Sequence, residues 1–151
     1  MSSTRVTPSR PRAICTALRH GRKVLSRRIA ELACAPDDAL AQGFDALVAA
    51  VEAAFRHEEL IMETLGYVHL QEHRAENAVV LSALHHVLPD VEGGDCALAR
   101  QVLAALADVL DLHRLSGDLA LTVAAHPAEA RARGHAARAT LHVAARRPAS
   151  R

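Results

Sequence analysis

Apolar residues recur every three or four positions along most of this chain, the spacing that places them on one face of an α-helix. The pattern predicts four helices: residues 13–33, residues 38–65, a third ending near residue 88, and a fourth ending before Pro127. We call the predicted buried stripe of each helix its seam. The seam of the first helix is Leu18, Leu25, Ile29 and Leu32. The seam of the second helix is Phe44, Leu47, Val51, Ala54, Glu58, Ile61 and Leu65. The seams of the last two are Leu70, His73, Asn77, Val80, Leu84 and Val87, and Leu98, Val102, Leu106, Val109 and His113.

Residues typical of helix ends separate the four stretches. Pro36, followed by two aspartates, indicates a stop and then a new N-cap. Gly66 is the expected C-terminal cap of the second helix. Residues 89–94 begin with Pro89 and are expected to form a loop, after which Asp95 caps the fourth helix.

The short connections favour antiparallel neighbours, so the expected fold is an all-α, up-down-up-down four-helix bundle. The bundle is expected to span residues 12–126. Residues 1–11 are rich in Ser, Thr, Arg and Pro and are predicted to be disordered. Residues 127–151 form a basic tail rich in Ala, Arg and His.

The composition narrows the class of protein. A chain of 151 residues with two Phe, one Tyr and no Trp favours closely packed helices around one core. A net charge of +1 gives no case for nucleic-acid binding by the whole molecule, and the tail lacks aromatic stacking residues. Three scattered Cys, no signal peptide and no apolar run of about 18 residues predict a cytoplasmic protein without a membrane partner.

Four polar residues occupy seam positions on three different helices: Glu58, His73, Asn77 and His113. A buried carboxylate has to be neutral, paired or bound to a metal. Imidazoles and carboxylates converging from facing helices are the recurrent construction of dinuclear iron or manganese sites in bundles. The donor types suit iron better than the metals that prefer thiolates.

Asp118 follows His113 by five residues, which leaves the two side chains about 140° apart on a regular helix. Ser116 and Gly117 lie between them. A one-residue π-bulge there would bring both side chains inward, and such bulges are frequent at functional sites. The sequence alone leaves this as a hypothesis.

The second-helix residues resemble a motif of the hemerythrin family, including its bacterial members. The family motif is His-Phe-x-x-Glu-Glu-x-x-Met. Phe55, Glu58, Glu59 and Met62 match it, and Ala54 stands in the place of the histidine.

The later motifs of the family are matched in part. The family has a Tyr followed six residues later by His-x-x-Glu-His, which Tyr67, His73 and Glu76 match, with Asn77 for the last histidine. In the fourth-helix motif, Trp-Leu-x-x-His-Ile-x-x-x-Asp, the matching residues are Leu110, His113 and Asp118. On the first helix, His20 stands near a loose match to the family's Lys-x-Leu.

This resemblance implies a non-haem iron centre of one or two ions. Glu58 and Asp118 would bridge the metals, His73 and His113 would serve one iron, and His20 the other. Asn77 offers only an amide oxygen. His69, four residues before His73, is a candidate replacement ligand one turn earlier on the helix.

The leading functional reading is a metal-binding protein with a reduced ligand set. Fewer nitrogen donors leave open coordination positions, which favours reaction with dioxygen, peroxide or nitric oxide, or iron handling, over reversible dioxygen carriage. No nucleophile triad, phosphate-binding loop or organic-cofactor motif supports another enzyme class.

The alternative is a metal-free bundle that acts as a binding or signalling module, with a vacated cavity beside Ala54. A weaker third reading is nucleic-acid contact through the basic tail.

Overall fold

The computed structural model describes the backbone of residues 10–125 and the side chains of residues 13–113. This part of the chain folds into four α-helices: α1 (Arg10–Ala33), α2 (Asp37–Thr64), α3 (Leu70–Glu92) and α4 (Cys96–Ala125). The predicted all-helical fold is confirmed. Helix α1 begins two residues before the predicted bundle boundary at residue 12. Most of the predicted N-terminal segment and all of the tail from 127 to 151 lie outside the described residues.

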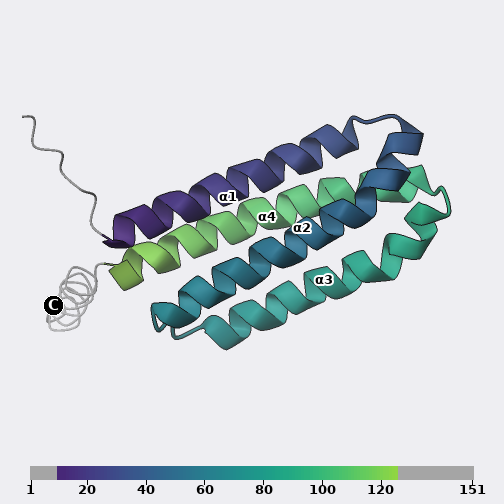
Figure 1. Ribbon diagram of the computed structural model, residues 1–151. Coiled ribbons are helices and arrows are strands. Elements are labelled where there is room, and N and C mark those ends of the chain that lie inside the picture. Colours follow the sequence, from purple (N-terminus) through teal and green to yellow (C-terminus); the bar gives the residue numbers. More distant parts are fainter. Residues whose placement is uncertain (1–9, 126–151) are drawn as a thin grey trace, which may run out of the picture.

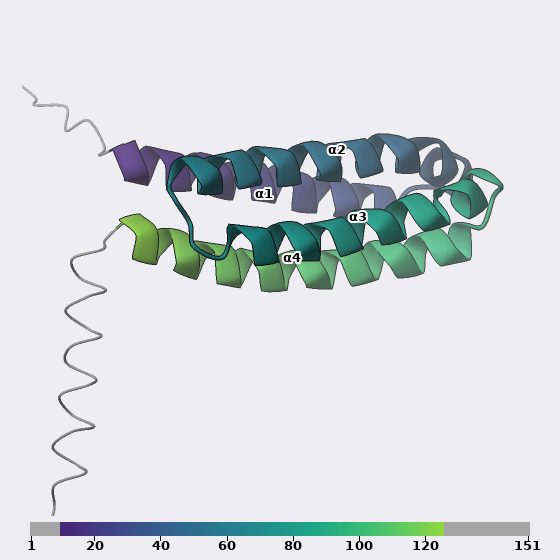
Figure 2. The ribbon, with the colours of Figure 1, turned by 90° about the horizontal axis from the view of Figure 1, so that it is seen from below.

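The four helices lie side by side as a bundle (Figure 1). Each helix packs against the next one in the chain, and α4 returns to pack against α1. Viewed from below, α1 and α2 form one side of the bundle and α3 and α4 the other (Figure 2). The connections, residues 34–36, 65–69 and 93–95, are short, so the end of each helix lies near the start of the next one. None of the four helices combines the length and apolar character needed to cross a membrane.

The core is built mainly from aliphatic side chains, with Phe44 and Phe55 buried among them. Phe44 is completely buried and packs among residues of α1, α2, α3 and α4 that include Ile29, Leu84 and Leu103. The predicted α1 stripe is confirmed, because its members are buried or half-buried. Helix α2 buries more residues than its predicted seam, because it contacts all three other helices. These extra buried residues are Leu40, Val48, Phe55 and Met62.

The buried face of α4 is broader than the predicted one. Leu106 is buried as predicted, and Ala99 and Leu103, each one position after a predicted residue, are completely buried. The other predicted members are half-buried: Leu98, Val102, Val109 and His113. The predicted seam therefore lies along one edge of the buried face, whose centre is shifted toward Ala99 and Leu103.

Two glycines end helices as left-handed caps. Gly66 has a φ of 67°, and its N–H donates to the Glu63 carbonyl at 3.0 Å while the Tyr67 N–H donates to the Met62 carbonyl at 2.9 Å. This pair of bonds is a Schellman motif and satisfies carbonyls that the helix end leaves unpaired. The predicted cap at Gly66 is confirmed. Gly94, with a φ of 102°, ends α3 in the same way.

The predicted loop over residues 89–94 is wrong at its start, because α3 continues through Pro89 to Glu92. Proline lacks the N–H that a helix interior needs. Here it stands in the last turn, and its own carbonyl still accepts a hydrogen bond from the Gly93 N–H at 2.9 Å. The predicted cap of α4 is confirmed, since Asp95 Oδ1 accepts from the Leu98 N–H at 2.9 Å.

Candidate metal centre

Helix periodicity brings four polar side chains into the bundle. Glu58 follows the buried Phe55 by three positions, so both lie on the inner face of α2. His73 and Asn77 are four residues apart and share one face of α3. Glu58 and Asn77 are the buried polar residues among the described side chains, with 9% and 1% of their surfaces exposed. His113 of α4 is half-buried.

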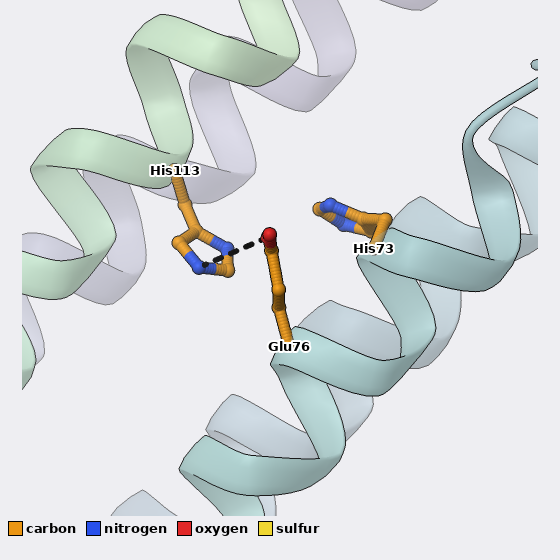
Figure 3. A group of neighbouring side chains, drawn as sticks. All are labelled: His73, Glu76 and His113. Carbon is orange, nitrogen blue, oxygen red and sulfur yellow. Dashed lines mark ion pairs between the residues drawn. The ribbon is translucent and has the colours of Figure 1, made fainter.

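Two histidines and one glutamate converge between α3 and α4. The ring centroids of His73 and His113 lie 5.7 Å apart. The Oε2 atom of Glu76 lies 3.9 Å from Nε2 of His113, and its carboxylate reaches between the two rings (Figure 3). One ligand atom from each of the three residues lies within 4.8 Å of the others. Sequence reasoning matched Glu76 to a family motif without assigning it to the site.

This donor set fits one metal ion. Bonds of about 2.1 Å to nitrogen and oxygen put two donors of the same ion about 3–4 Å apart. A small movement of the exposed Glu76 side chain would bring its carboxylate and the two imidazoles to that donor spacing. Imidazole with carboxylate suits iron, manganese or zinc.

The surroundings of His73 favour its neutral form. Its Nε2 atom is buried and has no hydrogen-bond partner, and the nearest carboxylate oxygen, Oε1 of Glu58, is 3.9 Å away. Burial lowers the pKa of His73 below its ordinary value of 6.5, against the raising effect of Glu58, and nearby His113 lowers it further. The lowered pKa of His73 favours the neutral imidazole, the form in which a histidine can coordinate a metal.

Glu58 is neutralised by an arginine that sequence reasoning missed. Arg22 of α1 forms an ion pair and hydrogen bond with Oε1 of Glu58, and both side chains are about nine-tenths buried, with 15% and 12% exposed. The sequence does place Arg22 on the buried stripe of α1, because it follows Leu18 by four positions and precedes Leu25 by three.

His20 does not join the group, because it is exposed on α1, two residues before Arg22 and on another face.

Asn77 is oriented by a second glutamate. Its Nδ2 donates to Oε1 of Glu59 at 2.8 Å, and Nε of Arg74 lies 3.6 Å from Oε2 of the same carboxylate. Glu59 is thus half-buried and paired. Oδ1 of Asn77 is buried without a hydrogen-bond partner. Among the side chains that the structure describes, Oδ1 of Asn77 and Nε2 of His73 are the buried polar atoms without a hydrogen-bond partner.

Of the two remaining candidate ligands, one lies apart from the group and the other is not described. His69 precedes α3, is exposed, and its Nδ1 contacts Oε2 of Glu72 at 2.7 Å. The backbone of α4 is α-helical from Cys96 to Ala125, which counts against the predicted π-bulge near Ser116. The side chain of Asp118 lies outside those described, so its role stays a prediction.

A cavity of about 90 Å³ lies beside Ala54, between α1, α2 and α4. Its walls are mostly apolar, and its polar lining includes Glu58 and His113. The neighbouring side chains therefore do not fill the space that a larger residue at position 54 would occupy. The apolar residues of the wall are Ala17, Leu18, Gly21, Leu25, Ala54, Phe55 and Leu110.

The part of the chain that the structure describes is a four-helix bundle with two imidazoles and a carboxylate gathered between α3 and α4. No protein-family model, curated protein or solved structure matches this chain. The cluster and the adjoining cavity are the features that bear on its function.

Proposed function

We propose that this protein is a hemerythrin-like, up-down-up-down bundle that binds one non-haem metal ion, iron, between His73, Glu76 and His113. The observation that carries the proposal is the convergence of one ligand atom from each of the three residues within 4.8 Å of one another. In addition, Nε2 of His73 is buried without a hydrogen-bond partner. A buried nitrogen that has lost its water and gained no partner costs free energy, and a metal ion would recover it.

The arrangement of the helices supports the hemerythrin-like part of the proposal. Short connections join neighbours that pack side by side, the construction of antiparallel bundles. Phe55, Glu58 and Met62, which carry the second-helix motif, are all buried on one face of α2. The absence of a histidine at Ala54 and the exposure of His20 favour one ion over two.

Three protein donors leave coordination positions open for a small ligand. The cavity beside Ala54 reaches His113 and Glu58, so it offers space for such a ligand next to the proposed ion. We propose dioxygen, peroxide or nitric oxide as its class, with binding or sensing as the role. An iron ion there would supply an exchangeable position and redox chemistry, while the chain's own residues hold it and restrict access by water.

The test is metal binding by the full chain, measured by elemental analysis after loading with Fe²⁺ without oxygen and by titration with Co²⁺ followed in visible absorption. We expect about one ion per chain. Replacement of His73 by Gln or of His113 by Gln should weaken binding at least tenfold, since each removes one of three donors.

The matched control is His86→Gln, the same change at an exposed position of α3. It should bind metal like the unaltered protein. No bound metal in well-folded protein, or equal losses from His73→Gln and His86→Gln, would refute the proposed centre.

The second candidate is a metal-free binding module. It is favoured by the ion pair between Arg22 and Glu58, which neutralises the buried carboxylate without a metal, and by the cavity beside Ala54. In that case the unaltered protein would hold no iron, and small apolar molecules would raise its melting temperature through the cavity.

A further inference from the structure

Glu58 is a second carboxylate beside the proposed ligands. Its Oε1 lies 3.9 Å from Nε2 of His73, a buried nitrogen without a hydrogen-bond partner. By distance alone, Glu58 is a natural further ligand. The same oxygen, however, is the one that Arg22 binds.

The guanidinium of Arg22 is a permanent cation, as arginine side chains are in proteins. It comes from α1, whereas the proposed ligands come from α3 and α4. Both partners of the ion pair are about nine-tenths buried, so water screens their attraction little. A divalent ion that used Oε1 of Glu58 would have to displace this cation.

We propose that Arg22 is a resident counter-cation that keeps Glu58 out of the metal's coordination and so limits the site to the donors of His73, Glu76 and His113. This inference rests on the proposed metal site. Arg22 is here a specificity-determining residue: it sets how many donors and how much negative charge the ion meets. With Arg22 removed, the buried carboxylate of Glu58 needs another cation, and the metal is the nearest one.

The test compares Co²⁺ affinity in the unaltered protein, Arg22→Met, Glu58→Gln and the double variant. We expect Arg22→Met to bind Co²⁺ at least tenfold more tightly, with a changed visible spectrum because the ion gains an oxygen donor. Adding Glu58→Gln to Arg22→Met should abolish that gain. The matched control, Arg27→Met, makes the same change at an exposed position of α1 and should alter neither affinity nor spectrum.

The double variant gives a second measurement, because it removes both charges of the buried pair and leaves neither uncompensated. It should bind Co²⁺ within threefold of the unaltered protein, because Glu58 is not a ligand while Arg22 holds it. A tenfold or greater loss of affinity in the double variant would show that Glu58 binds the ion despite Arg22 and would overturn the inference. So would Co²⁺ binding that is insensitive to Arg22→Met in folded protein. No Co²⁺ binding by the unaltered protein would overturn the proposed centre itself and this inference with it.

Discussion

The imidazole rings of His73 on α3 and His113 on α4 face each other with their centroids 5.7 Å apart and their planes tilted by 48°. Two imidazoles at this separation resist being protonated together, because the two positive charges would repel. Burial of His73 acts in the same direction. The pair therefore prefers a neutral His73 even where a solvated histidine would carry a proton.

We predict that the lowered pKa of His73 makes the metal-free protein less stable in mild acid. Below the ordinary pKa of 6.5, the unfolded chain binds a proton at this histidine that the native site resists. The free energy of unfolding should thus fall as the pH drops from above 6.5 toward the lowered, native pKa. Urea unfolding between pH 5 and 8, in the presence of a chelator, measures this slope.

His73→Gln should flatten the pH dependence, whereas His86→Gln, at an exposed position, should leave it unchanged. An identical slope in the unaltered protein and His73→Gln would mean that the native site does not resist protonation of His73.

Most of the fold was predictable from the sequence, because helix periodicity depends on local spacing. The α1 stripe and the caps at Gly66 and Asp95 are examples. The end of α3 was missed because Pro89 was read as a helix stop, although a proline in the last turn removes only one N–H. The buried face of α4 is predicted in part: Leu106 is buried, but the pattern does not select Ala99, because alanine gives a weak apolar signal.

The site was predictable only in part. Glu58, His73 and His113 were found because a polar residue in an apolar seam is conspicuous. Arg22 was not, since a long basic side chain on a basic helix resembles a solvated residue, and its partner is supplied by another helix. Glu76 is exposed and reaches the site by its length, so no burial pattern marks it.

We predict that Ala54→Leu stabilises the protein by about 1 kcal/mol, because each buried methylene contributes about 0.8 kcal/mol and the cavity can receive the larger side chain. The expected gain is smaller than full burial because Ala54 is half-exposed to the open part of the cavity. Ala53→Leu, at the adjacent exposed position, is the control and should change stability little. Urea midpoints at equal m-values measure both; a loss of stability in Ala54→Leu would show that the cavity cannot accept the side chain.

Alanine at two glycines should have opposite effects. Neither Gly66 nor Gly21 has an atom within 4 Å of the position that a Cβ would take. Gly66 has a left-handed φ of 67°, so Gly66→Ala should cost about 1–2 kcal/mol. Gly21 lies inside α1, so Gly21→Ala should stabilise by about 0.5–1 kcal/mol. Thermal or urea unfolding of the pair distinguishes backbone conformation from packing, and effects of the same sign would contradict the assigned cap.

Asn77 lies beside His73 on α3 and is hydrogen-bonded to Glu59. It lies one helical turn after His73, on the same face of α3, and its amide group donates to Oε1 of Glu59. An imidazole at this position could donate one ring N–H to Glu59 and present its other nitrogen to the proposed ion. A carboxylate behind a ligating histidine is the usual way in which such a ligand is oriented.

We therefore predict that Asn77→His binds Co²⁺ at least tenfold more tightly than the unaltered protein, because it adds a fourth donor. The larger ring at a position only 1% exposed should cost about 1–3 kcal/mol of stability in the metal-free protein. Titration in visible absorption measures the affinity, and urea unfolding measures the cost. Ala75→His, on the exposed face of α3, also adds one histidine and should leave Co²⁺ affinity unchanged. If Asn77→His and Ala75→His bind Co²⁺ with equal affinity, the face of α3 that carries His73 does not border a metal site. In that case a histidine added on this face would raise the Co²⁺ affinity no more than one added at the surface.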